Sequence, residues 1–395
     1  MGASSSRDVE TSRTTEGGEN VRIKYAAASM QGFGIEMEDA HTVVPDLDHT
    51  TSFFGLYDGH GGDEVALLCA RLFHVELQVH PNYQSDLDNA IRSVFSRMDE
   101  VLQQSNVWRE LVNPPGGSGN FLHRIICPIA NPCTAKRPKI LLDYHFIIVC
   151  FIHHFVSFYP QETPYIPPQN TGSSASVAVI RGNRVIVGNV GDSHCVASRD
   201  GQAIQLSTDH KPRHRGEIRR IQRAGGKIDI DQHVVREAGR VIGFTVFRGM
   251  LATSRAIGDF VFKQNKSLPP EEQIVICNPD IRNMEITNDI EFLVIASRGI
   301  WASLTCQDVV DFVREEFEYG VTDLRVICER LLRYAQPTVF DMTVILIQFK
   351  HDAPDDAEET EEDNDSQEIK SDASDGQEIK LAASDEEQRP FAPNG

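Results

Sequence analysis

The sequence lacks two features typical of secreted proteins. Its eight cysteines include no C-x-x-C pair, and no apolar stretch of the signal-peptide type follows Met1. Because disulfide frameworks belong to oxidising compartments and a leader peptide needs an apolar core, free thiols in an intracellular protein, cytoplasmic or nuclear, are the simplest interpretation.

The sequence also lacks a basic surface charge. The formal net charge of the chain is −20, and residues 351–395 contribute −13 of it through eight Asp and eight Glu against two Lys and one Arg, which leaves about −7 for residues 1–350. A nucleic-acid footprint on the folded part is therefore not expected. The acidic tail at 351–395 is predicted to be disordered, either as a solvated segment or as a docking segment for a basic partner.

Apolar residues are almost absent from the N-terminus, and residues 1–22 are predicted to be disordered. The first residues fit the M-G-x-x-x-[ST] pattern for myristoylation of Gly2. A single acyl chain would give only weak membrane association.

Residues 113–163 differ in character from their surroundings, being crowded with Pro, Cys, His, Phe and Ile. The run 140–158 is apolar enough to suggest a membrane span, but Asp143 and three histidines inside it would be costly in hydrocarbon, so a span is not favoured. The histidines also lack a metal-ligand spacing. The segment is either a tolerated surface insertion or the translation of sequence normally removed from the message.

The remainder alternates short β-rich runs with a few helices, without the regular strand-helix order of a parallel sheet. Residues 176–180 and 184–190 flank Gly182-Asn183 as in a hairpin, and 342–349 is the last strand. Thr305 and Asp308 have the spacing of a capping box for a helix that runs to residue 317. We therefore expect an antiparallel α+β domain over residues 23–350.

An apolar run at 53–57 stops abruptly at Asp58-Gly59-His60-Gly61-Gly62. Glycines let the backbone approach a ligand closely, so Asp58 and the Gly59 carbonyl can both face a hard cation, with His60 as a proton donor or acceptor. An ordinary strand-to-helix turn would show the same local pattern.

Further acids, Glu38, Asp39 and Asp192, lie in separate segments, mostly beside apolar strands. Their convergence with Asp58 at one end of a sheet would be electrostatically costly without cations. Oxygen ligands favour Mg²⁺ or Mn²⁺, and two such ions bridged by one Asp are suited to phosphate monoester hydrolysis.

Several motifs together resemble the type 2C metal-dependent protein serine/threonine phosphatases, especially plant members: SMQGFGIEMEDAH, FFGLYDGHGG, TGSSASVAVI, VGNVGDS, LATSRAIGD and FLVIAS before GIW. The resemblance covers residues 25–349 apart from the segment at 113–163. It implies a sandwich of two antiparallel β-sheets flanked by helices on both outer faces, and phosphoprotein substrates. We expect a monomer.

The resemblance also implies roles for the acids. Asp58 would bridge two Mg²⁺ or Mn²⁺ ions, the Gly59 carbonyl and Glu38 would hold one of them, and Asp39 would act through water. Asp192 would serve an additional, weaker metal.

Two further positions concern the substrate. His60 would protonate the leaving alcohol. At the position of Gly34 the family has an Arg that binds the substrate phosphate, so this chain lacks the bidentate guanidinium contact there.

Three metal-site acids of the family are replaced as well. The family's D-G-x-W-D has become a segment with Arg298 at its start and Ala302 at its end, and the acid of D-N-M has become Phe340. Asp341 can substitute one position along only if a local bulge turns its side chain back to the same face.

These replacements leave two main functional hypotheses. The first is a protein serine/threonine phosphatase with impaired activity. The second is a pseudophosphatase that binds or scaffolds phosphoproteins, in which the Arg298 guanidinium takes the vacated cation position and pairs with Asp58.

Overall fold

The computed structural model describes residues 13–34, 36–104, 170–226, 235–237, 240–243, 253–335 and 339–351. These residues belong to one unit, Met1–His351, and a second unit, Asp352–Gly395, lies outside them. The predictions for Gly2 and for the insertion at 113–163 lie outside the described residues. The same holds for the predicted acidic tail at 351–395, except for its first residue, His351.

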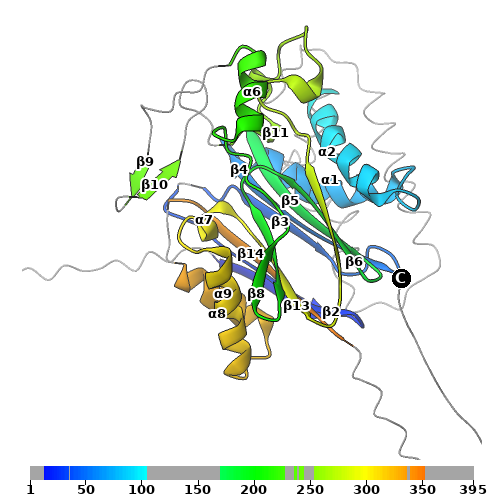
Figure 1. Cartoon of the computed structure of the whole chain (residues 1–395), viewed down its shortest axis with the longest axis vertical. Helices are drawn as coiled ribbons and strands as arrows, with labels where there is room; N and C mark the ends of the chain where they lie inside the picture. The colour runs from blue at the N-terminus through cyan, green and yellow to red at the C-terminus, as the bar shows by residue number, and fades with distance from the viewer. Residues whose placement is uncertain are drawn as a thin grey trace, which may run out of the picture. The chain divides into compact units, whose positions relative to one another are not determined.

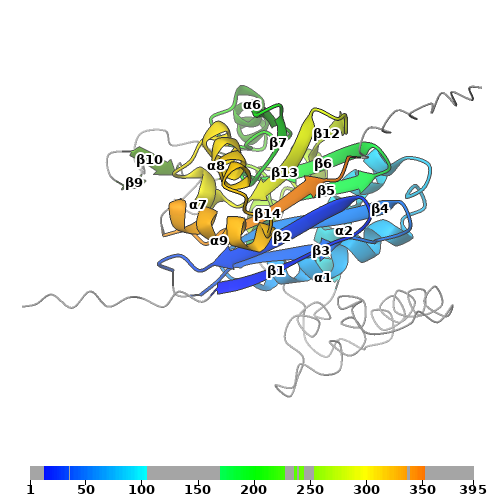
Figure 2. The same cartoon turned by 90° about the horizontal axis from the view of Figure 1, so that it is seen from below.

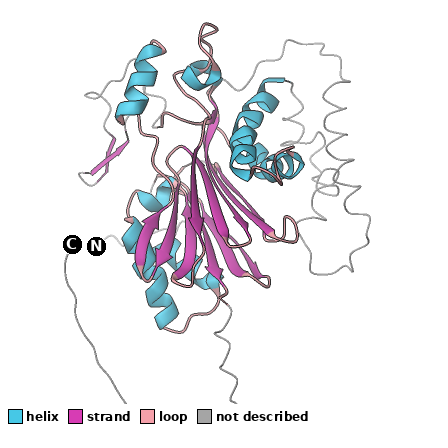
Figure 3. Cartoon of the chain, turned by 45° about the vertical axis from the view of Figure 1, so that its right-hand side comes forward, coloured by secondary structure: helices cyan, strands magenta, loops and turns pink. Residues whose placement is uncertain are grey.

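Two antiparallel sheets contain most of the described strands (Figure 3). The first sheet has the strand order β1 (Arg13–Glu19), β2 (Ile23–Met30), β14 (Met342–Phe349), β13 (Ile290–Ala296), β7 (His194–Arg199) and β8 (Gln202–Gln205).

The second sheet has the order β12 (Asp280–Glu285), β6 (Arg184–Val190), β5 (Gly172–Arg181), β4 (Thr51–His60) and β3 (Asp39–Val44), with the short β11 (Ile257–Gly258) paired to the start of β5. A separate two-stranded ribbon joins β9 (Val235–Glu237) to β10 (Arg240–Gly243).

Helices cover both outer faces of the sandwich, as the sequence predicted (Figures 1 and 2). On the second sheet these are α1 (Glu64–Val79) and α2 (Leu87–Gln104), and on the first sheet α8 (Cys306–Glu318) and α9 (Leu324–Tyr334). Shorter elements are α6 (Arg215–Arg223), α7 (Arg298–Trp301), η2 (Phe260–Phe262) and η3 (Pro270–Glu272). None of the helices described here is both long and apolar enough to cross a membrane.

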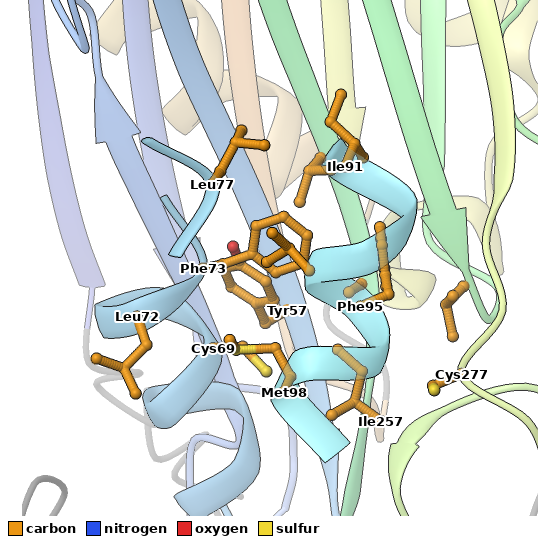
Figure 4. Close-up of a cluster of buried hydrophobic side chains, with 14 of the residues drawn as sticks. Tyr57, Cys69, Leu72, Phe73, Leu77, Ile91, Phe95, Met98, Ile257 and Cys277 are labelled. Carbon is orange, nitrogen blue, oxygen red and sulfur yellow. The ribbon is translucent and has the colours of Figure 1, made fainter. Parts of the chain in front are cut away.

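The three largest buried clusters of the described residues follow this layering: one lies between the sheets and one under each helical layer. Figure 4 shows the cluster beneath α1 and α2, where Tyr57 of β4 meets Phe73 and Phe95 of the helices. The Phe73 and Phe95 rings meet edge to face at 4.9 Å. Because all three aromatic side chains are fully buried, this cluster anchors β4, whose end carries Asp58.

Local sequence signals account for several boundaries. Gly182, with a φ of +55°, allows the tight turn between β5 and β6. At the start of α8, the Thr305 side chain accepts a hydrogen bond from the Asp308 amide, and the Asp308 carboxylate accepts one from the Thr305 amide, which confirms the predicted capping box.

Strand β1 corrects the prediction of disorder over residues 1–22. Residues 13–19 pair with β2 along their full length, from Arg13 opposite Met30 to Glu19 opposite Lys24. The segment is polar, but an edge strand is held by backbone hydrogen bonds and needs no apolar side chains of its own. Composition alone therefore missed it.

Candidate active site

The two acids Asp39 and Asp58 lie side by side at the ends of neighbouring strands. They are directly opposite in the register of β3 and β4, so their side chains share one face of the sheet. Burial, together with the charge of Asp58, raises the pKa of Asp39 well above its usual value. Burial and Asp192 raise the pKa of Asp58 to about 6, against the opposing effect of Arg298. Asp39 Oδ2 is buried and has no hydrogen-bond partner among the described residues.

Glu38 lies against the glycine loop that follows Asp58. Its backbone carbonyl accepts a hydrogen bond from the Gly59 amide at 3.2 Å, and its Oε1 accepts one from the Gly62 amide at 2.6 Å. A Cβ on Gly59 would stand 2.4 Å from the Glu38 carbonyl oxygen, so only glycine fits there. Burial raises the pKa of Glu38. The absence of a side chain at Gly59 thus lets the Glu38 backbone lie against it, while the predicted approach of Gly59 to a ligand stays a prediction.

His60 has a partner that the sequence did not indicate. Its Nε2 lies 2.6 Å from Oδ2 of Asp259, whose side chain is only 2% exposed. Burial lowers the pKa of His60, but the hydrogen bond and charge of Asp259, together with the charges of Asp58 and Asp192, outweigh it and the pKa is raised. The two residues are 199 positions apart. The only local signal was the LATSRAIGD motif that ends in Asp259.

Asp341, just before β14 of the first sheet, contacts the segment between β2 and β3. One of its carboxylate oxygens accepts a hydrogen bond from the Gly32 amide at 2.8 Å, and the other accepts one from the Glu38 amide at 2.7 Å. It precedes β14 and is not part of the strand, so the alternation of side chains along that strand does not determine its direction. Asp341 therefore tethers the segment that carries Glu38.

Arg298 makes a different ion pair from the one predicted. Its backbone amide, at the start of α7, donates to Asp58 Oδ2 at 3.2 Å, while its guanidinium Nε lies 3.7 Å from Asp192 Oδ2. The guanidinium also stacks over the Phe340 ring at 4.2 Å. Thus two of the positions that depart from the motifs contact each other, and the guanidinium pairs with Asp192.

Asp192 is also bound by a cation that sequence reasoning missed. Lys211 Nζ donates to Asp192 Oδ2. Burial would raise the pKa of Asp192, but Lys211 and Arg298 outweigh it, and the pKa lies well below the usual range. With two cationic partners, this carboxylate has its charge largely balanced already.

The other two departures from the family motifs are Gly34 and Ala302. Gly34 is exposed, and a Cβ there would come no closer than 3.6 Å to another atom. Ala302 ends α7, where its amide donates to the Arg298 carbonyl. Among the described residues, no three His, Cys, Asp or Glu side chains form a group arranged to hold a metal ion.

Comparison with known proteins accounts for this arrangement. A family model described as "Protein phosphatase 2C" matches residues 23–118 and 156–338. "Probable protein phosphatase 2C 21" of Oryza sativa subsp. japonica is 47% identical over 350 residues, covering 89% of this chain and 90% of that protein. "Probable protein phosphatase 2C 20" of the same organism is 46% identical over 86% of this chain, which spans 61% of that protein.

A solved structure of serine-threonine phosphatase 2C from Toxoplasma gondii has the same fold. It superposes with a TM-score of 0.58 at 17% identity and covers 85% of this chain and 99% of its own. The predicted α+β sandwich is confirmed, and the chain belongs to the protein phosphatase 2C family.

Proposed function

We propose that this chain is a protein serine/threonine phosphatase with strongly attenuated turnover, acting on phosphoserine or phosphothreonine in phosphoproteins. The observation that carries the proposal is the contact between the partly exposed His60 and the buried Asp259, beside Asp58. This pair gives the family's proton donor a fixed position, although three metal-site acids of the family are replaced. The proposed catalytic domain is residues 23–350.

The family is metal-dependent, and the residues present fit one divalent ion better than two. Asp39 and Asp58 repel each other, and Asp39 Oδ2 lacks a partner among the described residues, so a cation would relieve a charge imbalance. We propose that Asp58, the Gly59 carbonyl and Glu38 hold Mg²⁺ or Mn²⁺, with Asp39 acting through water. When bound, such an ion lowers the pKa of a coordinated water and polarises the phosphoryl oxygens.

The residues at the position of the family's other ion do not fit a metal ion. The backbone amide of Arg298 already donates to Asp58, and the Arg298 guanidinium supplies positive charge beside Asp192. The Phe340 ring under the guanidinium replaces a further carboxylate. Asp192 has Lys211 as a second counter-charge, which also weakens the case for an additional ion at that site.

The chain's own residues have the following parts in this proposal. His60, held through Nε2 by Asp259, would supply the proton to the leaving alcohol from its other ring nitrogen, Nδ1. Asp341 holds the Glu38 segment by accepting two backbone hydrogen bonds. No Arg stands at position 34, so the substrate phosphate loses one bidentate contact.

A second candidate function is that of an inactive phosphatase that binds phosphoproteins. The observation that favours it is the Arg298 guanidinium, a permanent cation suited to a phosphate group. In that case, the protein would bind a phosphopeptide without added metal and without turnover.

Phosphate release from a phosphothreonine peptide by the full chain, with and without Mn²⁺ or Mg²⁺, separates the two functions. We expect slow, metal-dependent release that is lost in Asp58→Ala. The double substitution Arg298→Asp and Phe340→Asp, which restores two family carboxylates, should raise the rate. Release no greater than that of Asp58→Ala would contradict the attenuated enzyme, and metal-independent peptide binding would then support the binding protein.

A further inference from the structure

Helix α6 and the residues just before it concentrate positive charge in a folded part that is otherwise acidic. Residues 1–350 have a formal net charge of about −7, whereas residues 211–223 contain one Lys and five Arg against a single Glu, which gives +5. Two of these cations, Lys211 and Arg220, lie against carboxylates. Three of the remaining four are exposed arginines of the helix itself.

These three residues, Arg215, Arg219 and Arg223, form a single row along α6. They are spaced four residues apart, so successive side chains lie one turn apart on the same side of the helix. The opposite side carries Glu217 and Ile221, which are buried. We call the row the arginine strip. At the rise of an α-helix it is about 12 Å long.

The arginine strip is unfavourable for the helix that carries it. Like charges four residues apart repel each other, and Arg215 places a positive charge in the first turn, where the helix dipole disfavours it. Among the described residues, no carboxylate forms an ion pair with the strip, and its guanidinium groups have one hydrogen bond, from Arg219 Nε to the Arg215 carbonyl at 3.2 Å. Residues that break a local rule in this way are expected where a ligand supplies the missing partner.

Contacts on the buried side of α6 hold the strip near the candidate active site. Glu217 Oε1 lies 2.8 Å from Arg255 Nη2, and Glu217 Oε2 accepts a hydrogen bond from the Ser254 hydroxyl at 2.6 Å. The segment that begins at Ser254 continues through β11 to Asp259 of the candidate active site. Figure 1 shows α6 at the end of the sandwich where β11 lies. The strip is therefore fixed to the same segment that positions Asp259.

The distance from the site to the strip is short enough for one peptide to cover both. Lys211, whose ammonium binds Asp192, precedes Arg215 by four residues, so their Cα atoms are at most about 14 Å apart. Adding the Lys211 side chain and the length of the strip gives a path of about 30 Å, which an extended peptide spans with roughly ten residues. A peptide bound at the site through its phosphorylated residue thus reaches the strip with the residues that flank it.

The chemistry of the strip selects an acidic peptide as its partner. Guanidinium groups stay charged at physiological pH and pair bidentately with carboxylates. Because residues 1–350 are net negative, a wide anionic surface such as a membrane or a nucleic acid meets repulsion from the rest of the domain. An acidic peptide segment is small enough to contact the strip alone.

We propose that the arginine strip is a docking site for acidic segments of phosphoprotein substrates. It selects phosphothreonine or phosphoserine residues that have a run of Asp or Glu within roughly ten positions. This inference rests on the proposed phosphatase function, because one peptide occupies both the site and the strip. Exposed ion pairs are individually weak, and three of them together give about a tenfold preference in Kd. The preference decreases as salt screens the charges.

Binding of phosphothreonine peptides to the full 395-residue chain tests the proposal without requiring turnover. One fluorescent peptide has a run of Glu on the N-terminal side of the phosphothreonine, a second has it on the C-terminal side, and a third has Gln in place of every Glu. Fluorescence anisotropy without added metal gives each Kd at low and at high salt. We expect one acidic peptide to bind about tenfold tighter than the Gln peptide at low salt, with a smaller difference at high salt. Phosphate release with Mn²⁺ is measured in parallel.

A triple variant removes the strip and keeps residues that favour a helix. Its substitutions are Arg215→Gln, Arg219→Gln and Arg223→Gln, and we expect it to bind the acidic and Gln peptides alike. The matched control changes the net charge equally by removing three arginines elsewhere that are each more than half exposed. Its substitutions are Arg184→Gln, Arg325→Gln and Arg333→Gln. The control should keep the preference, and thermal unfolding checks that both variants are folded.

Equal Kd values for the three peptides at low salt overturn the proposal, and this comparison needs only the unmodified chain. A preference that persists in the triple variant, or that disappears as fully in the control, overturns it equally. Vesicles of phosphatidylcholine and phosphatidylserine in equal amounts test the other anionic partner. Vesicle binding that is lost in the triple variant, without a preference for acidic peptides, would assign the strip to a membrane surface and overturn the proposal.

The two readouts separate this proposal from the proposed function. Phosphate release without a preference for acidic peptides would support the phosphatase and overturn the docking site. A preference for acidic peptides without any release would support the docking site and contradict the phosphatase.

Discussion

The close packing around Gly172 allows a sharp test of the pair formed by His60 and Asp259. Gly172 begins β5, directly opposite His60 on β4. A Cβ at this position would stand 2.4 Å from Asp259 Oδ2 and 2.7 Å from His60 Nε2. Since carbon rarely approaches these atoms within 3 Å, Gly172→Ala must push the two side chains apart.

The size of the effect follows from what must move. To relieve the contact, the Asp259 and His60 side chains must move by roughly 0.6–1 Å. This movement stretches the 2.6 Å hydrogen bond between His60 Nε2 and Asp259 Oδ2 to or beyond its useful limit. Overpacking in a tight site costs about 1–3 kcal/mol, and loss of a hydrogen bond to a charged group costs about 1.5–3 kcal/mol. Because breaking the bond is itself the way the clash relaxes, the two costs overlap. We expect the free energy of unfolding to fall by about 2–3 kcal/mol.

The loss of stability in Gly172→Ala should depend on pH in a definite direction. The folded-state pKa of His60 lies above its ordinary value of 6.5, so protonation favours the folded state. This contribution is fully present below pH 6.5 and is lost as the pH rises through the raised folded-state pKa. Gly172→Ala should therefore destabilise the protein more at pH 5.5 than at pH 9.

Urea unfolding of both proteins at the two pH values measures the effect. Gly216→Ala is the matched control. Gly216 is in α6, no atom lies within 4 Å of its added Cβ, and the substitution should stabilise that helix by about 0.5–1 kcal/mol. Equal stability of Gly172→Ala and the unmodified chain would refute the packing argument, while a loss of the same size at both pH values would refute the role of His60 charge.

Three further substitutions test the fold by the same unfolding assay. The control is Tyr319→Ala, because this side chain is 78% exposed and its loss should change the free energy of unfolding by less than about 0.5 kcal/mol. Phe73→Ala should cost about 3–5 kcal/mol because it leaves a cavity beneath α1 and α2, and a loss below 1 kcal/mol would contradict its central packing. Thr305→Ala removes the capping hydrogen bond and should cost about 1 kcal/mol; no change would show that the cap contributes little. Asp99→Ala leaves the buried Lys263 without the carboxylate at 2.5 Å and should cost about 3–5 kcal/mol, so a neutral result would mean that the ammonium finds water.

Local patterns predicted a large part of the fold. Two β-rich runs around a Gly-Asn turn indicated the hairpin of β5 and β6, and the spacing of Thr305 and Asp308 indicated the start of α8. These signals work because each depends on neighbours within a few residues. Strand β1 was missed since its stability depends on the exposed edge of β2, which lies outside its own sequence.

For the candidate active site, too, the sequence determined some features and the tertiary structure determined others. The sequence by itself determined that Asp58, Gly59 and His60 end a buried strand, that Glu38 and Asp39 accompany them, and that Arg298 and Phe340 stand where the family has acids. It also determined family membership, through motifs that need no coordinates to be compared.

Tertiary structure alone decided which charges meet. Asp259 with His60, Lys211 with Asp192, and Glu217 with Arg255 are pairs brought together from different strands, helices and loops. The guanidinium of Arg298 was expected at Asp58, yet it is the backbone amide that reaches Asp58 while the guanidinium reaches Asp192. The identity of a side chain states what charge it carries, but its partner depends on the direction in which the folded backbone points it, and no local pattern encodes that direction.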